Sequence, residues 1–113
     1  MKILIVEDNP QMRSELRHWL SDVATDFAEC ADGADALDAY RNFLPDWVLM
    51  DWEMKLVDGL TATREIVAVY PNAKILMLTL HDIARLRDAA HSAGATGFIL
   101  KDELPMLRQI IAK

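Results

Sequence analysis

The sequence contains very little cysteine and no long apolar run, and each shortage excludes a class of protein. Cys30 is the only cysteine among 113 residues, so the chain can form neither an internal disulfide nor a paired-thiolate metal or redox site. No uncharged apolar stretch approaches the roughly 20 residues of a membrane helix. Residues 1–8 also become acidic too early for a signal peptide. We therefore expect a cytoplasmic protein that does not enter a membrane.

Basic residues are scarce as well: 12 lysines and arginines stand against 18 aspartates and glutamates, a formal net charge of −6. Nucleic acids and anionic membranes bind to basic surfaces, so this balance argues against direct binding of either by this segment. Clustered acidic groups would favour a cation instead. A chain of 113 residues, 52% of them hydrophobic, can form one packed core but not two, so residues 1–113 are interpreted as one domain.

Short apolar runs alternate with amphipathic stretches along the whole sequence. Continuous apolar runs are typical of strands that are buried on both faces of a sheet. Strands are predicted at residues 3–6, 27–31, 47–50, 74–78 and 97–100. A helix is predicted after each strand, beginning near residues 10, 32, 58, 83 and 102. This (βα)₅ order predicts an α/β fold with a mostly parallel sheet and helices on both of its faces.

Individual residues mark the predicted ends of several helices. Pro10 suits the first turn of the first helix, where a missing backbone N–H does no harm. Asp32 and Asp102 are predicted to cap the second and the last helix. Pro45 is predicted to end the second helix.

Polar residues follow four of the five predicted strands. Because ligands of such folds bind outside the carboxyl ends of the strands, these residues are expected to meet at one rim of the sheet. They are Glu7, Asp8, Asp51, Thr79 and Lys101. Each one alone is more often a helix cap, a turn residue or a solvated charge. Their joint placement at one rim favours a functional site.

The residue types at this rim suit magnesium-dependent phosphoryl transfer. Mg²⁺ prefers carboxylate oxygens, and Asp8 and Asp51 are the predicted direct ligands, with Glu7 acting through a bound water. Asp51 can also be the nucleophile. Thr79 can hydrogen-bond one phosphoryl oxygen and Lys101 can pair with another.

Five segments of the sequence resemble the receiver domains of two-component response regulators. They are Ile3 to Asp8, Val48-Leu49-Met50-Asp51, Asp58-Gly59, Leu78-Thr79 and Phe98-Ile99-Leu100-Lys101. The resemblance covers the whole chain. It implies a flavodoxin-like three-layer fold with strand order 2-1-3-4-5, a sensor histidine kinase as phosphodonor, Mg²⁺ as cofactor and phosphorylation of Asp51. It also implies a signalling role rather than that of an enzyme, a metal ligand in the backbone carbonyl of Glu53, and a switch pair in Thr79 and Phe98.

The segment 94–102, followed by Pro105, resembles receivers of the NarL/FixJ type more narrowly. Such receivers generally precede a helix-turn-helix DNA-binding domain, so the resemblance implies a transcriptional output and homodimer formation on phosphorylation. The chain is then either a part of a longer regulator or a stand-alone receiver. The surface formed by the last two helices and the last strand is the expected partner contact, with Arg85, Asp88, Asp102 and Arg108 as candidates.

The sequence departs from the receiver pattern at several positions near the predicted site. Lys55-Leu56 replaces the Pro-Gly that usually follows Met54, which removes one restricted φ angle and one flexible position. Leu80 stands where many receivers have a small residue, so it is expected to narrow access to the phosphoryl group. Phe98 has no hydroxyl group to hydrogen-bond Thr79, so packing would have to drive any switch.

Two other functions are consistent with parts of the pattern. A haloacid-dehalogenase-type phosphohydrolase also uses Mg²⁺ and a nucleophilic aspartate, with a second carboxylate two positions later, where Glu53 stands here. That class would place its nucleophile on the first strand and would leave Glu7 and Asp8 unexplained. A phosphate-independent interaction module is the third hypothesis, favoured by Lys55 and Leu80 and opposed by the complete set of five polar residues.

Overall fold

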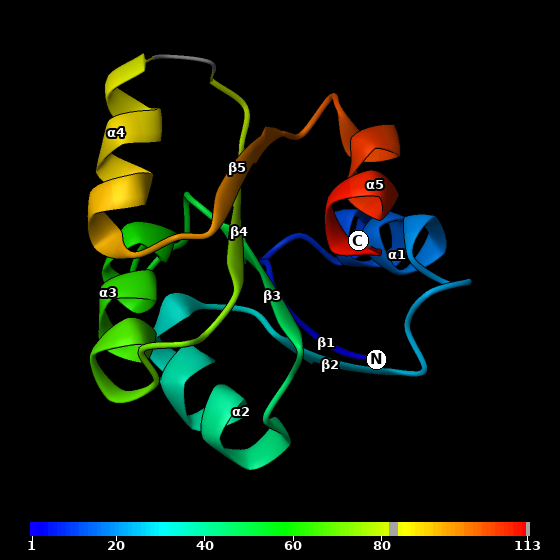
Figure 1. The fold of residues 1–113 in the computed structure, drawn as a ribbon, viewed down its shortest axis with the longest axis horizontal. Coiled ribbons are helices and arrows are strands. Elements are labelled where there is room, and N and C mark those ends of the chain that lie inside the picture. Colours follow the sequence, from blue (N-terminus) through cyan, green and yellow to red (C-terminus); the bar gives the residue numbers. More distant parts are fainter. Residues whose placement is uncertain (82–83, 113) are drawn as a thin grey trace.

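A parallel sheet of five strands forms the middle layer of the protein (Figure 1). The computed structural model describes residues 1–81 and 84–112. Its strands pair in the order β2-β1-β3-β4-β5, which confirms the order implied by the resemblance to receivers. The strands are β1 (Lys2–Val6), β2 (Asp26–Cys30), β3 (Trp47–Asp51), β4 (Ile75–Thr79) and β5 (Gly97–Leu100).

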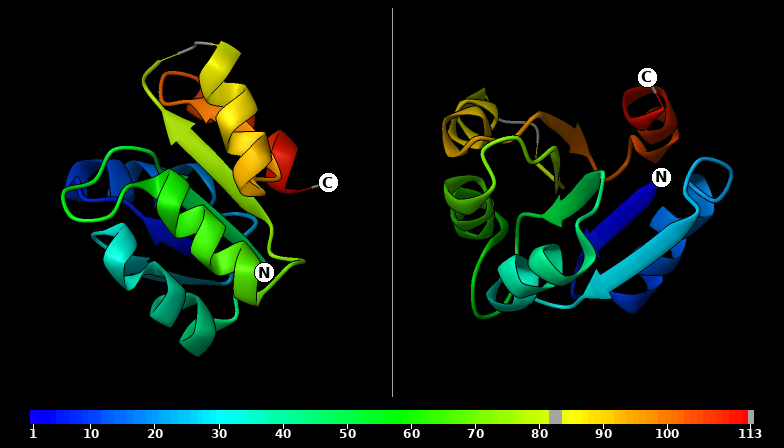
Figure 2. Two further views of the ribbon diagram at one scale, coloured as in Figure 1. Left: turned by 90° about the vertical axis from the view of Figure 1, so that its left-hand side faces the viewer. Right: turned by 60° about the horizontal axis from the view of Figure 1, so that its bottom comes forward.

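Helices cover both faces of this sheet, so the fold has three layers (Figure 2). On one face lie α1 (Pro10–Trp19), the 3₁₀ turn η2 (Leu104–Met106) and α5 (Leu107–Ile111). On the other face lie η1 (Gly33–Asp35), α2 (Ala36–Phe43), α3 (Gly59–Val69) and α4 (Ala84–Ala93). Within the described ranges, none of these helices has the length and apolar content to cross a membrane.

Strand β1 shows why the predicted strands are continuously apolar. Ile3 and Ile5 belong to the core on the α1 and α5 face, whereas Leu4 and Val6 belong to the core on the opposite face. All four side chains are fully buried. Complete burial of such a side chain contributes about 1.5–3 kcal/mol, so a polar residue at any position of β1 would be costly.

The first two helices have the boundaries that the sequence indicates. Asn9 caps α1 by accepting hydrogen bonds from the backbone N–H groups of Gln11 (2.9 Å) and Met12 (3.2 Å), and Pro10 opens the helix as predicted. Leu44 ends α2 in the left-handed conformation at φ 49°, directly before Pro45. This conformation is uncommon for a residue with a side chain, and it stops the helix at the predicted position.

The last helix differs from its prediction. Asp102 lies in a turn and does not cap it; the chain enters η2 after Glu103, whose carboxylate accepts a hydrogen bond from the backbone of Leu100 (3.2 Å). Asp32 is a cap as predicted, but of η1, which leads into α2. The predicted start of the fourth helix, at Ile83, lies outside the described residues, and α4 is described from Ala84 onward.

Gly59 lets helix α3 approach the end of strand β3. A Cβ atom at this position would lie 2.0 Å from the backbone oxygen of Asp51. We predict that Gly59→Ala lowers the free energy of unfolding by about 1–3 kcal/mol, because the helix must move away from the strand. Gly97→Ala is the matched control, since its Cβ would meet only the end of the flexible Leu76 side chain. Urea unfolding of both variants measures the difference, and equal losses would contradict the assignment.

Candidate functional site

The five polar residues predicted to meet at the sheet rim do line one pocket of about 360 Å³. Glu7 and Asp8 follow β1, Asp51 and Thr79 end β3 and β4, and Lys101 follows β5. The β3–α3 and β4–α4 loops contribute further residues. These are Trp52, Glu53, Met54, Lys55 and Leu80, and Asn9 completes the lining from the start of α1.

Three carboxylates form the acidic part of the pocket. One oxygen atom from each of Glu7, Asp8 and Asp51 lies within 4.8 Å of the other two. Glu7 and Asp51 are only 1% and 2% exposed, whereas Asp8 is half-buried. Buried carboxylates this close repel one another unless a cation compensates their charge.

Lys101 supplies a positive charge to this cluster. Its Nζ lies 2.7 Å from Asp51 Oδ1 and 3.0 Å from Glu7 Oε1. The backbone N–H of Lys101 donates to the carbonyl of Thr79 (2.7 Å), which fixes the chain just beyond β5. Burial alone would lower the pKa of Lys101, but its contacts with Asp51 and Glu7 raise it on balance. The side chain therefore stays charged.

The surroundings of Glu7 disfavour the charged form of its carboxyl group. Burial, opposed by Lys101 and reinforced by the nearby Asp51, raises the pKa of Glu7 to about 7. Oε2 accepts a hydrogen bond from the backbone of Asn9 (3.2 Å). Oε1 is buried beside Lys101, and among the residues that the structure describes it has no well-aligned hydrogen bond. A buried carboxylate oxygen left in this state has free capacity for a cation or for a cation-bound water.

Arg13 holds the backbone of Glu7 in place, a role that was not predicted from the sequence. Its Nη1 donates to the backbone carbonyl of Glu7 (2.7 Å), and its Nε pairs with Glu29 on β2 (2.9 Å). Arg17, one turn later on α1, pairs with the same carboxylate. The sequence signal was available in the four-residue spacing of the two arginines, which places both on one side of the helix.

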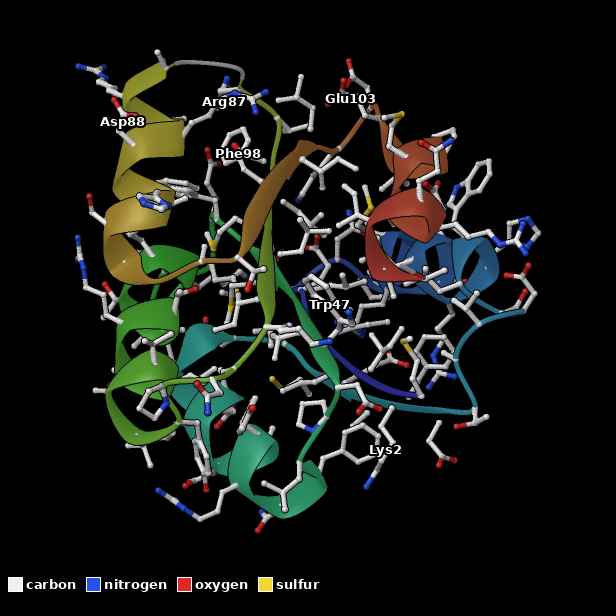
Figure 3. The ribbon with its side chains drawn as sticks, viewed as in Figure 1. Lys2, Trp47, Arg87, Asp88, Phe98 and Glu103 are labelled. Carbon is white, nitrogen blue, oxygen red and sulfur yellow. The ribbon has the colours of Figure 1, made fainter. Side chains whose placement is uncertain are left out.

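Thr79 and Phe98 lie on neighbouring strands β4 and β5. Thr79 is buried, and its hydroxyl oxygen accepts a hydrogen bond from the backbone of His81 (3.2 Å). The Phe98 ring lies beside α4 and close to Arg87 (Figure 3). Its centroid is 6.3 Å from that of Trp52 and 4.6 Å from the Arg87 guanidinium. Phe98 is thus held by packing and a cation–π contact, without a hydroxyl group.

Two of the departures from the receiver pattern, Lys55 and Leu80, line the pocket. Leu80 is 69% exposed and Leu56, next to Lys55, is 81% exposed, so both leucine side chains lie largely in solvent. His81, the residue after Leu80, places its Nε2 atom 3.6 Å from a carboxylate oxygen of Glu53, which lines the pocket. The narrowing of access by Leu80 stays a prediction.

The donor set fits Mg²⁺. The candidate ligands are hard oxygen atoms, and a half-buried Asp8 leaves the site open to water and phosphate, which Mg²⁺ usually keeps in its coordination shell. A hydroxyl and an ammonium group line the same pocket. The arrangement can therefore hold a divalent cation beside an anionic phosphoryl group.

Comparison with known proteins agrees with this geometry. The sequence model of the response regulator receiver domain matches residues 3–112. The transcriptional regulatory protein DegU of Brevibacillus brevis is 32% identical over 105 residues, which cover 90% of this chain and only 44% of DegU. Protein CcdB of Bacillus subtilis is 37% identical over 101 residues, covering 88% of this chain and 84% of CcdB. The crystal structure of a LuxR-family two-component response regulator from an Aurantimonas species superposes with a TM-score of 0.86 at 31% identity, covering 98% of this chain and 84% of that one. The chain belongs to the response regulator receiver domain family.

Proposed function

We propose that residues 1–113 form a phosphoacceptor domain in which Asp51 receives a phosphoryl group from a sensor histidine kinase in a Mg²⁺-dependent reaction. One observation carries the proposal: Lys101 Nζ lies 2.7 Å from Asp51 Oδ1 and 3.0 Å from Glu7 Oε1, inside a cluster of three carboxylates. A lysine held between two buried acids is ready to pair with an incoming phosphoryl oxygen. Family membership supports the same role.

Four residues of the pocket would take part in metal binding, and one of them, Asp51, is also the nucleophile. Asp8, Asp51 and the backbone carbonyl of Glu53 would hold Mg²⁺, and Glu7 would bind one of its waters. The bound ion would neutralise the repulsion between carboxylate and phosphate. A carboxylate oxygen of Asp51 attacks phosphorus, and the bond from phosphorus to the donor's imidazole nitrogen breaks as the new P–O bond forms.

Two further side chains meet the phosphoryl oxygens as the charge moves. Lys101 exchanges part of its contact with Asp51 for one phosphoryl oxygen, and Thr79 donates its hydroxyl hydrogen to another. Phe98 would follow Thr79 through packing and so transmit the change to α4. This response would constitute the switch of the domain.

The two rival functions are less well supported. A haloacid-dehalogenase-type hydrolase would have its nucleophile after β1, whereas Asp51 ends β3 and β1 is followed by Glu7 and Asp8. Receiver family membership favours signalling over hydrolysis. A module without phosphoryl chemistry would not need a lysine held between two buried acids, so that hypothesis explains less of the pocket.

A transcriptional output is proposed from the relatives. DegU is described as a transcriptional regulatory protein, and this chain spans 44% of it. The surface of α4, β5 and α5 is the proposed partner contact and the proposed site of homodimer formation on phosphorylation. Arg85, Asp88 and Asp102 on this surface are exposed, and Arg108 already pairs with Asp22 (2.8 Å).

Replacing Asp51 by Asn should abolish phosphorylation, because it exchanges the nucleophilic carboxylate for a neutral amide of almost the same volume. The measurement is the intact mass after incubation with acetyl phosphate and Mg²⁺, where the parent should gain one labile phosphoryl group. Asp102→Asn is the matched control, since it removes an exposed carboxylate beside Lys101. An undiminished adduct on Asp51→Asn would disprove the assignment, and steady hydrolysis of added phosphate esters would favour the hydrolase.

The raised pKa of Glu7 predicts how stability depends on pH without Mg²⁺. The folded pKa of about 7 lies above the ordinary value of 4.5, so the folded state binds more protons between these values. Stability should therefore fall as pH rises from about 5 to 8, by about 3 kcal/mol at most. Glu7→Gln should flatten this part of the profile. Denaturant unfolding in chelator at several pH values measures it, and parallel profiles for the two proteins would contradict the prediction.

A further inference from the structure

Asp32 makes contacts that go beyond capping η1. Its side chain is buried, and Oδ1 accepts hydrogen bonds from the backbone N–H groups of Ala34 (2.9 Å) and Val57 (3.0 Å). Oδ2 accepts a third bond from the backbone N–H of Leu56 (2.9 Å). The bond to Ala34 is the cap. The bonds to Leu56 and Val57 reach the loop between β3 and α3, more than twenty residues away.

This loop, residues 52–58, forms one wall of the acidic pocket. Its base is fixed by two backbone bonds, from Trp52 N–H to the Leu78 carbonyl (3.0 Å) and from Gly59 N–H to the Trp52 carbonyl (2.9 Å). Glu53, Met54 and Lys55 lie between this base and the segment held by Asp32, and all three line the pocket. The position of Asp32 therefore bears on the shape of the pocket wall.

The two loops are also packed tightly against each other. A Cβ atom on Gly33 would lie 2.3 Å from the backbone oxygen of Val57 and 3.1 Å from that of Asp58. Only glycine permits this approach. It brings the carboxylate of Asp32 within hydrogen-bond distance of the loop backbone.

The loop has few restraints of its own at Lys55 and Leu56. It contains no proline, so no ring restricts φ in this segment. The Leu56 side chain is 81% exposed and cannot fix the loop by packing. Charge-assisted bonds from backbone N–H groups to a carboxylate are roughly twice as strong as neutral ones, so Asp32 is well suited to restrain the loop.

We propose that Asp32 is a positioning residue for loop 52–58. It holds residues 53–57 of this loop, and with them the backbone carbonyl of Glu53, in the position required for Mg²⁺ binding beside Asp51. The inference rests on the proposed function of the pocket. The role requires both carboxylate oxygens, because they serve two separate loop positions at once. An asparagine at this position would retain one acceptor oxygen and present an NH₂ group to the other N–H.

The test compares Asp32→Asn and Asp32→Ala with Asp58→Ala as the matched control. Asp58, the last residue of the loop, also has a capping carboxylate, which accepts a hydrogen bond from the backbone N–H of Thr61 on α3 (2.7 Å). Amide hydrogen exchange at Leu56 and Val57 reports the restraint. Mg²⁺ titration followed by tryptophan fluorescence reports the site, because Trp52 lines the pocket.

Both Asp32 variants should lose protection of the Leu56 and Val57 amides and bind Mg²⁺ about tenfold more weakly, as is usual when a group supporting a metal ligand is removed. Asp58→Ala should keep both properties within about twofold. Asp32→Asn tests the role even where Asp32→Ala does not fold. Parental Mg²⁺ affinity in a folded Asp32 variant would overturn the inference while leaving the proposed function intact. Absence of Mg²⁺ binding by the parent protein would overturn both.

Discussion

The ammonium group of Lys101, placed between Glu7 and Asp51, is the interaction on which the site depends. Three carboxylates lie close together at the carboxyl edge of the parallel sheet, and two of them are almost completely buried. Their mutual repulsion opposes folding. Lys101 offsets part of this cost while the pocket holds no metal. The single charge of Lys101 does not balance the three carboxylates of this cluster, so the cluster keeps a surplus of negative charge. In the proposed function, this surplus would attract a divalent cation and, with it, the phosphoryl group.

The rest of the fold brings these charges together and holds them. The strand order places β1 beside β3, so Glu7 and Asp8 lie next to Asp51 although more than forty residues separate them in the sequence. Gly59 allows α3 to close on the end of β3, and Arg13 fixes the backbone of Glu7. Residues of loop 52–58 complete the wall of the pocket, and Asp32 in the β2–α2 connection accepts hydrogen bonds from the backbone of this loop.

The sequence was sufficient to predict the strands and the five polar residues that meet at the rim, because continuous apolar runs end at those residues, whereas the strand order came from the resemblance to receivers. The sequence was insufficient to predict local structure and residue roles that depend on three-dimensional contacts. The cap predicted at Asp102 was wrong, since the chain makes a turn there and enters a 3₁₀ segment containing Pro105. Asp32 was predicted only as a cap, because its bonds to Leu56 and Val57 depend on the close approach that Gly33 permits.

The most direct test of this account is the thermal unfolding of the parent protein and Asp51→Asn, each in chelator and in millimolar Mg²⁺. In chelator the variant should melt higher, because it has lost one repelling charge while Lys101 retains Glu7 as a partner. Mg²⁺ at about 100 times its dissociation constant should stabilise the parent by about 2.7 kcal/mol, a rise of roughly 10 °C, and should stabilise the variant less. A parent that gains nothing from Mg²⁺, together with a variant that is no more stable without it, would contradict the acidic pocket.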